Sequence, residues 1–307
     1  MSIWWRPMKV KVLLNPYSNR WNAQKRWPIA AAALKSVGVD FDLSASEHPD
    51  QLVDLAADSV RQGYSTIVIA GGDGSIGEVI NGITRHFDGK RKIPATIGII
   101  PLGSANDFAF ALSLPLDLND AAQVIASSQT KSVDLCKCND RFFINNSGCA
   151  LEPYVTTKHE RIHWIKGMAR YLVAAMWAIM DKPQWQGELT WDGGEYHGLL
   201  SLISVGNGRR TGGFFMTPHA DPFDGKLTLA FGYRGTRLGL FSALPRAFKE
   251  GQGNYIELEG MYEIHCTRLH IHLDQPSPAH TDGELFDSWL TDFDYQIFPG
   301  AVSVLVK

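Results

Sequence analysis

The stretch IAGGDGSIGEVI, residues 69–80, decides how the first part of the chain folds. A β-branched run at residues 66–70 precedes the glycines, and apolar residues recur at helical spacing from Ile76 to Phe87. This order predicts a strand, a tight glycine turn and an amphipathic helix. Within it, GDGSIG matches the G-x-G-x-x-G spacing that is typical of a dinucleotide-binding turn.

Three features oppose a dinucleotide site. The motif follows the third expected strand rather than the first, and no acidic residue closes the next strand, which ends in IIPLG. Asp73 occupies the second motif position, where a carboxylate would face phosphate charge unless a cation intervened. Because Mg²⁺ takes oxygen ligands, Asp73 suits a metal–nucleotide site better. The turn alone would also fit a structural role, with Asp73 as a helix cap.

Strands and helices alternate in the first part of the chain. Apolar runs at residues 10–14, 39–43 and 96–100 predict further strands, and residues 50–62 predict a helix. Such repeated units with fully apolar strands indicate a parallel sheet covered on both faces. After about residue 133, short strands and glycine-rich turns predict an antiparallel β-domain, with one helix expected over residues 158–180.

Three polar loops follow strands of the expected parallel sheet. They are NPYSNR at residues 15–20, the GGDGS turn, and PLGSANDF at residues 101–108. Ligands of open α/β sheets bind at the carboxyl ends of the strands, where all three loops would meet. Ser104, Asn106 and Asp107 fall at a helix start, where backbone amides hold anions.

Bulk properties narrow the classes of function. The 307-residue chain is 45% hydrophobic with a net charge of -3, so nothing draws it as a whole to nucleic acid, and no nucleic-acid partner is expected. No apolar run approaches the roughly 20 residues of a membrane span, and no signal peptide is visible, which favours the cytoplasm.

The four cysteines lack metal or redox spacing and are expected to be free thiols. His270 and His272 share one strand face with Arg268, which indicates a solvated face rather than a metal site.

Four segments resemble the diacylglycerol kinase-like lipid kinases, which include bacterial diacylglycerol kinases and sphingoid-base kinases. They are GGDGSIGEVINGI, PLGSANDFA, VGNGRRTGGFFMTPHADPFDGKL and HTDGEL, they occur in the family's order, and they span nearly the whole chain. NAD kinases and phosphofructokinases share GGDG, but GSANDFA and the late DGE favour the lipid kinases. On its own, TDGE would suit an exposed Asp-Gly turn.

The resemblance implies a two-domain fold. Residues 1–133, joined by about 290–307, would form an NAD-kinase-like α/β nucleotide-binding domain. Residues 134–289 would form an antiparallel β-sandwich, with the C-terminal strand, VSVLVK, returning to the first domain. ATP would lie in the interdomain cleft.

The resemblance also implies roles for single residues. The phosphates of ATP would be bound by the glycine turn, which comprises Gly71, Gly72, Asp73, Gly74 and Ser75. The neighbouring loops would contribute Asn15, Ser104, Asn106 and Asp107 to the same nucleotide site. A Mg²⁺ would be held by Asp221, Asp224 and the backbone of Lys226. Glu284 of the DGE would accept the hydroxyl proton, whereas the sphingoid-base branch assigns that role to Asp73.

The chain departs from the family pattern at four positions. Ser75 replaces the usual Thr and keeps the hydroxyl, whereas Gly77 replaces a common Asn and loses a side-chain contact. Asn19 and Ala150 stand where the family often has Gly. These departures concern details of nucleotide contact rather than the class of protein.

We therefore expect an ATP- and Mg²⁺-dependent kinase that phosphorylates a lipid alcohol such as diacylglycerol or a sphingoid base. Lys158, Arg161, Lys166 and Arg170 recur at roughly helical spacing beside aromatic residues, which suits contact with the inner face of the membrane without insertion. A solvated helix edge is the alternative for these four residues. An NAD(P)-binding oxidoreductase and a catalytically silent lipid-binding relative stay open as alternatives, and so does a homodimer.

Overall fold

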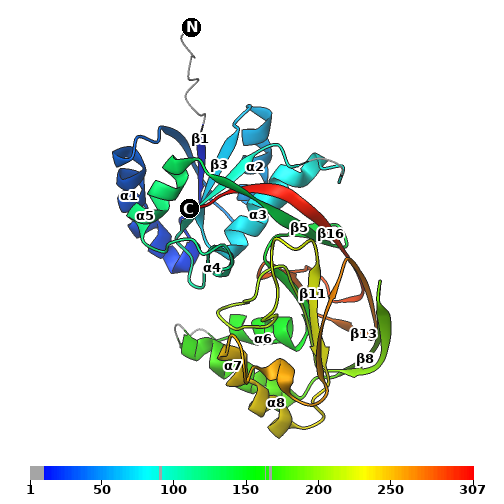
Figure 1. Cartoon of the computed structure of the whole chain (residues 1–307). Coiled ribbons are helices and arrows are strands. Elements are labelled where there is room, and N and C mark those ends of the chain that lie inside the picture. Colours follow the sequence, from blue (N-terminus) through cyan, green and yellow to red (C-terminus); the bar gives the residue numbers. More distant parts are fainter. Residues whose placement is uncertain (1–9, 90–91, 163, 166–167) are drawn as a thin grey trace. The chain divides into compact units, whose positions relative to one another are not determined.

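The computed structural model describes residues 10–89, 92–162, 164–165 and 168–307, which divide into two compact units. Unit 1 comprises residues 10–135 together with Phe298–Lys307, and unit 2 comprises Cys136–Ile297. Figure 1 follows the chain from strand β1 in blue to the end of strand β16 in red.

Unit 1 contains the expected parallel sheet. Its strands run in the order β2-β1-β3-β4, and the end of β16 pairs in parallel with β4 through Ser303 and Val304. The expectation that the C-terminal strand returns to the first domain is therefore confirmed. The bounds are β1 (Val10–Leu14), β2 (Phe41–Ala45), β3 (Thr66–Gly71), β4 (Thr96–Pro101), β5 (Thr130–Cys138) and β16 (Leu290–Leu305).

Helices cover both faces of this sheet. Helix α1 packs beside α5 and α2 beside α3, and Figure 1 shows the two pairs on opposite sides of the strands. Gly82 allows α2 and α3 to approach, because a Cβ there would collide with the carbonyl oxygen of Val53. The bounds are α1 (Ser18–Ser36), α2 (Gln51–Arg61), α3 (Asp73–Ile83), the 3₁₀ turn Thr84–His86, α4 (Asp107–Ala111) and α5 (Leu118–Ser127).

Two boundaries in unit 1 differ from the sequence-based expectation. Strand β2 begins at Phe41, two residues later than expected, because the amide of Val39 still bonds the carbonyl of Leu34 in the turn that ends α1. Phe87 lies beyond α3, after the 3₁₀ turn, although its spacing continued the apolar face of the helix. Both shifts reflect turns that close a helix, which apolar periodicity does not report.

Unit 2 is built from two antiparallel sheets, as expected. One contains β9-β8-β13 and the part of β16 in this unit, with β5 pairing β6 nearby, and the other has the order β12-β11-β10-β7-β14-β15. The bounds are β6 (Arg141–Phe143), β7 (Asn146–Ala150), β8 (Trp185–Trp191), β9 (Gly194–Leu200), β10 (Leu202–Gly206), β11 (Leu227–Gly232), β12 (Met261–Cys266), β13 (Arg268–Ser277), β14 (Ala279–Thr281) and β15 (Glu284–Leu285).

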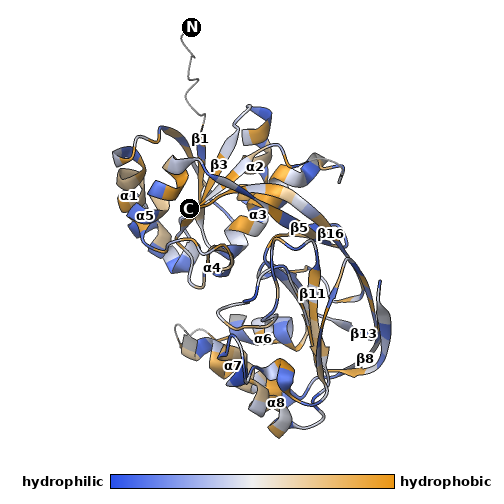
Figure 2. Cartoon of the chain, in the orientation of Figure 1, coloured by the Kyte–Doolittle hydropathy of each residue, from blue (hydrophilic) through white to orange (hydrophobic). Residues whose placement is uncertain are grey.

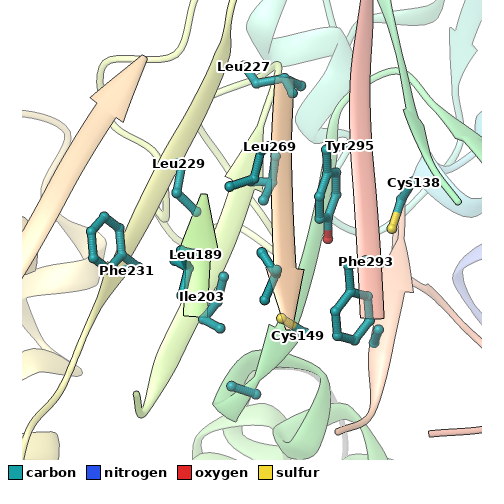
Figure 3. Packing of buried hydrophobic residues seen from close by; sticks show 14 of the residues in the cluster. Cys138, Cys149, Leu189, Ile203, Leu227, Leu229, Phe231, Leu269, Phe293 and Tyr295 are labelled. Carbon is teal, nitrogen blue, oxygen red and sulfur yellow. The ribbon is translucent and has the colours of Figure 1, made fainter. Parts of the chain in front are cut away.

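The core of unit 2 lies between these two sheets. Figure 3 shows Ile203 and Leu229 of one sheet facing Leu269 and Phe293 of the other, all of them buried. All four cysteines are free and buried, so the expectation of free thiols is confirmed. Burial raises the pKa of the Cys138 thiol to about 12, which keeps it protonated and unreactive at neutral pH.

The helices of unit 2 correct one expectation. Residues 158–180 do not form one helix: α6 (Leu151–Glu160) ends in a turn, and α7 (Met168–Asp181) begins separately. Both helices bury apolar residues in the same cluster. The apolar spacing in the sequence therefore continues from one helix to the next and does not reveal the break between them. The remaining helices are α8 (Arg237–Ala243) and the 3₁₀ turns Arg246–Phe248 and Tyr255–Glu257.

The division into two helices changes the role of Lys158. Its side chain is buried, with Nζ 2.6 Å from a carboxylate oxygen of Asp181 at the end of α7. The ammonium also lies over the rings of Tyr154 and Trp177, 4.7 and 4.8 Å from their centroids. The expectation that Lys158 belongs to an exposed cationic surface is therefore wrong. Lys166, expected on the same surface, lies outside the described residues.

Candidate active site

In unit 1, the loops that follow β1 and β3 are joined by hydroxyl and amide groups. The Oγ of Ser75 accepts a hydrogen bond from Asn15 Nδ2 at 3.0 Å and lies 3.2 Å from the Oγ of Ser18. Ser18 Oγ also accepts the amide N–H of Gly72 at 3.2 Å. The structure thus brings Asn15 and Ser75 together, as expected, and adds Ser18, which the sequence reasoning missed although it lies in the same NPYSNR loop.

The loops that follow β3 and β4 touch through two glycines. A Cβ on Gly72 would lie 3.0 Å from the Cα of Gly103, and a Cβ on Gly103 would collide with the Cα of Gly72. Gly103 does not have a positive φ, so close approach is what requires glycine here. The glycines of these two motifs therefore serve to bring two backbones together.

Asp73 is the first residue of helix α3, whose N-cap is Gly72. One of its carboxylate oxygens, Oδ1, accepts the amide N–H of Phe108 at 3.0 Å and so links the turn to α4. The first hydrogen bond within α3 runs from Ile76 N–H to the carbonyl of Gly72, so the amides of residues 73–75 have no acceptor inside the helix. An anion can bind at such a helix start.

The loop after β4 is held in shape by its own polar side chains. Asn106 Oδ1 accepts the amide of Gly103 at 2.9 Å, and its Nδ2 donates to the Gly103 carbonyl at 3.2 Å. Ser104 Oγ donates to Asn19 Oδ1 at 3.0 Å, which connects this loop to the one after β1. Asp107 is buried at the first residue of α4. These three expected nucleotide residues lie at the same sheet edge as Asn15 and Asp73.

Asn19, which stands where the family often has glycine, has a left-handed backbone conformation. It begins three consecutive residues with left-handed φ angles, at 51°, 55° and 68° for Asn19, Arg20 and Trp21. Asn tolerates this conformation better than most residues with a side chain, so it can replace glycine here at modest cost. Left-handed residues of this kind tend to be retained at functional sites.

The DGE segment of unit 2 is a turn between β14 and β15. Asp282 is not an exposed turn residue: its carboxylate is buried and accepts the amide N–H groups of Ile144, Asn145 and Asn146 at 2.9, 2.9 and 3.0 Å. Sequence reasoning missed this role, since the three donors lie more than 130 residues earlier in the chain. Glu284 is exposed, and its backbone carbonyl accepts Arg141 Nη1 at 3.2 Å.

The expected magnesium ligands lie in the exposed turn before β11. One oxygen of Asp221 accepts the amide of Phe223 at 3.1 Å, and one of Asp224 accepts the amide of Lys226 at 2.9 Å. Both carboxylates offer oxygen, which is the donor that Mg²⁺ prefers. Within the described part of the chain, no three His, Cys, Asp or Glu side chains gather as a metal group. A cation at Asp221 and Asp224 would therefore need backbone or water oxygens as well.

Ala150 connects β7 to α6 in a conformation that favours glycine. Its φ and ψ are 70° and -130°, and its side chain is fully buried. A Cβ makes this region of backbone space costly, by on the order of 1–3 kcal/mol. The departure from the family's glycine is thus a source of strain in the helix that carries Glu152.

Unit 2 also contains an apolar pocket of about 80 Å³. Helices α6, α7 and α8 and the sheet containing β10 contribute to its wall, which includes Leu151, Val155, Ile179, Leu202 and Leu240. Glu152 and Arg234 are the charged residues that line it. The cavity can accommodate apolar groups, with charged atoms at its boundary.

Comparison with known families gives two matches that together cover most of the chain. Residues 9–138 match the model of the diacylglycerol kinase catalytic domain. Residues 148–306 match the model of the YegS C-terminal NAD kinase beta sandwich-like domain.

Curated relatives and solved structures agree with these matches. A diacylglycerol kinase of Staphylococcus saprophyticus is 30% identical over 72% of this chain and 72% of its own length. One of Staphylococcus carnosus is 25% identical over 90% of this chain and 88% of its own. A crystal structure of a diacylglycerol kinase from Bacillus anthracis superposes with a TM-score of 0.74 at 20% identity, covering 98% of this chain and 97% of that one. These findings favour the kinase over the dinucleotide interpretation of GDGSIG.

Proposed function

Because the chain belongs to the diacylglycerol kinase family, and is a phosphotransferase with an alcohol acceptor, we propose that it transfers the γ-phosphate of ATP to a lipid alcohol. Diacylglycerol or a sphingoid base is the acceptor class. The observation that carries the proposal is the edge of the unit 1 sheet, where a helix start, two touching glycines and several hydroxyl groups lie together.

On the nucleotide side, the amides at the start of α3 bind phosphate oxygens, and the hydroxyl groups of Ser75 and Ser18 lie beside them. Asn15 fixes the Ser75 hydroxyl, and Asn106 fixes the loop that touches Gly72. Ser104 and Asp107 belong to that loop. Preorganised donors of this kind stabilise transferring phosphoryl charge without rearrangement during the reaction.

Mg²⁺ bound with ATP would supply positive charge that neutralises the phosphates as the phosphoryl group departs. Asp73 would be a ligand of this nucleotide-bound cation, since its carboxylate lies at the start of α3, where the phosphates would bind. Asp221, Asp224 and the carbonyl of Lys226 would hold a second, structural Mg²⁺ in unit 2 through oxygen ligands.

Glu284 accepts the proton of the acceptor hydroxyl in this proposal. Its side chain is exposed on a turn whose backbone is held by Asp282 and Arg141. The backbone position of Glu284 is therefore fixed, while its carboxylate is accessible to a substrate. Asp73 is the alternative proton acceptor, but one of its oxygens is engaged by the amide of Phe108. A carboxylate within hydrogen-bond reach of the alcohol suffices for this step.

A lipid acceptor accounts for the apolar features of unit 2. The cavity behind α6, α7 and α8 can take an apolar group of the acceptor. Large apolar side chains are also exposed on α7 and α8, among them Met176, Trp177, Met180 and Leu238, and Figure 2 shows hydrophobic residues along both helices. Such a surface suits peripheral contact with a membrane, where exposed Arg161 would meet anionic headgroups.

We propose a peripheral contact. No helix in the described ranges combines the length and apolarity of a membrane span. Co-sedimentation with anionic vesicles tests this contact. Replacing Trp177 and Met180 with Ser should weaken binding, whereas replacing Leu43, which is exposed on unit 1, should not. Equal binding of all three proteins would contradict the assignment of this surface.

The activity itself is tested by incubating the full chain with ATP labelled at the γ-phosphate, Mg²⁺ and mixed vesicles. The vesicles contain diacylglycerol, a sphingoid base, ceramide or no lipid alcohol, and a soluble alcohol serves as a further acceptor. We expect label in the product of diacylglycerol or the sphingoid base. Binding to vesicles without transfer to any acceptor would instead identify a catalytically silent relative.

A further inference from the structure

A buried acid–imidazole pair lies next to the DGE turn. Glu152 of α6 and His280 of β14 are both buried, with 4% and 2% of their side chains exposed. Glu152 Oε1 and His280 Nε2 are 3.0 Å apart. The resemblance to known families gave no role to either residue, and neither takes part in the proposed chemistry described above.

The second nitrogen of His280 faces the turn. The amide N–H of Gly283 points at His280 Nδ1, 3.3 Å away. A backbone amide can only donate, so Nδ1 is the acceptor and the ring proton is on Nε2, which donates to Glu152. The imidazole thus spans the distance between α6 and the residue that immediately precedes Glu284.

The turn is therefore fixed on several sides. The Asp282 carboxylate holds it to the three consecutive amides of residues 144–146, and Arg141 Nη1 holds the carbonyls of Glu284 and Leu285 at 3.2 and 3.0 Å. The amide of Asp282 also donates to the carbonyl of Asn146 at 2.7 Å. His280 adds an attachment at Gly283, whose φ of 87° favours glycine. Without His280, nothing else that the structure records holds the Gly283 amide.

Stability alone is a poor explanation for this pair. Glu152 Oε2 is buried with no hydrogen-bond partner in the described part of the chain, and an incompletely satisfied buried carboxyl is costly. An apolar pair of similar volume would be no less stable at this position. Buried polar pairs of this kind are often retained because they fix one geometry, and the geometry fixed here is that of the turn bearing Glu284.

We propose that His280, oriented by Glu152, is a positioning residue that holds the Gly283 amide and thereby sets the direction of the Glu284 carboxylate toward the acceptor hydroxyl. The proposal rests on the role of Glu284 in the proposed function. Glu152 also lines the apolar cavity, so the same helix turn that contacts the cavity orients the imidazole. His280 itself need not touch the substrate.

Two amide variants separate the two nitrogens of the imidazole. In His280→Asn, the side-chain oxygen can occupy the place of Nδ1 and accept the Gly283 amide, whereas the contact with Glu152 is lost. In His280→Gln, the longer side chain can reach Glu152 as Nε2 does, whereas the acceptor for Gly283 is lost. Both variants leave a polar group buried, so both should lower the melting temperature by comparable amounts.

Steady-state kinetics and hydrogen exchange then test the proposal. We expect His280→Gln to lower kcat about tenfold, because small misplacement of a reacting group is costly, with the KM for ATP unchanged. His280→Asn should keep most of the kcat. Exchange at the Gly283 amide should accelerate in the Gln variant only. His270→Gln on the exposed strand face is the matched control and should change none of these values.

The double variant Glu284→Gln with His280→Gln distinguishes failure of this proposal from failure of the proposed function. If His280 acts through Glu284, the double variant loses no more kcat than Glu284→Gln alone. Equal kcat in folded His280→Gln and wild type, or unchanged Gly283 exchange, would overturn the positioning role while leaving Glu284 as proton acceptor. Full activity in Glu284→Gln would instead overturn the proposed function on which this inference rests.

Discussion

The edge of the unit 1 sheet that we propose to bind phosphate and the DGE turn of unit 2 are built in opposite ways. In unit 1, glycines and small hydroxyl residues bring three short loops into contact, and each contact involves residues of a recognisable motif. In unit 2, one buried carboxylate and one buried imidazole hold the turn to partners that lie 128 to 138 residues earlier, or beside it. Close backbone approach preorganises the first region, and buried charge preorganises the second.

The largest expected effect tests the buried carboxylate. Asp282→Asn removes the charge and places an amide donor against three backbone amides. We expect about 3 kcal/mol less free energy of unfolding, measured by urea denaturation, because hydrogen bonds to a buried charged group are among the strongest. Asp287→Asn, at an exposed position after β15, is the control. A variant as stable as wild type would mean that the turn does not depend on Asp282.

Disrupting the contact between Gly72 and Gly103 in unit 1 should weaken ATP binding. Gly103→Ala inserts a methyl group against the backbone of Gly72, so the two loops must separate. We expect at least about tenfold weaker ATP binding by calorimetry, since displaced amides lose their phosphate geometry. Gly251→Ala, where a Cβ would meet nothing within 4 Å, should bind ATP normally. Equal affinity in both variants would break the argument that close approach builds this site.

Ala150 offers a stabilising change in unit 2. Ala150→Gly relieves the positive φ of 70°, and the gain should exceed the added flexibility of the unfolded chain by about 1 kcal/mol. Thermal unfolding would show a higher melting temperature. Ala32→Gly, within the regular part of α1, should show the opposite sign, because glycine is a poor helix former. A loss of stability at both positions would mean that the strain at Ala150 is absent.

The Lys158–Asp181 pair should give the smallest effect, and one that depends on pH. The hydrogen bond from Lys158 lowers the pKa of Asp181 below its ordinary 3.8. Burial opposes the charge of Lys158, but its bonds to Asp181 and Tyr154 outweigh burial and raise the pKa of Lys158 above 10.5. A lowered carboxyl pKa contributes stability above 3.8 that is lost as the pH falls through it, and a raised ammonium pKa contributes stability below 10.5 that is lost as the pH rises.

Asp181→Asn should therefore lower the free energy of unfolding slightly between about pH 4 and pH 10, by less than about 1 kcal/mol, because the Asp181 carboxylate is partly exposed. The difference from wild type should shrink as the pH falls through the lowered pKa of Asp181. A difference that stays constant down to about pH 2 would show that charge pairing is not its origin.

The same contrast explains what the sequence could predict. The strands of unit 1 and the loops at their carboxyl ends were predictable, because apolar runs and glycine spacing are local signals. The antiparallel strands of unit 2 were predictable for the same reason. The break between α6 and α7 was not, because two helices that pack on one cluster present one continuous apolar period.

Contacts between residues that lie far apart in the chain could not be predicted from the sequence either. The three backbone amides that bind Asp282 lie far from the DGE motif in the chain, and the burial of Lys158 against Asp181 leaves no local signal either. A basic residue near aromatic residues has the same local pattern whether it faces solvent or an acidic partner on another helix. The turn around Glu284 was recognisable as DGE, whereas the residues that hold it were visible only in three dimensions.

In the proposed mechanism, the carboxylates of Asp73 and Glu284 have different tasks, and one paired measurement distinguishes these tasks most directly. ATP affinity in the presence of Mg²⁺ and turnover with a lipid acceptor are measured for Asp73→Asn and Glu284→Gln, with folding checked by circular dichroism. We predict that Asp73→Asn loses most ATP binding and most activity, whereas Glu284→Gln binds ATP as wild type does and turns over at least about a hundredfold more slowly. Near-wild-type turnover in either variant, or loss of ATP binding in Glu284→Gln, would contradict the account.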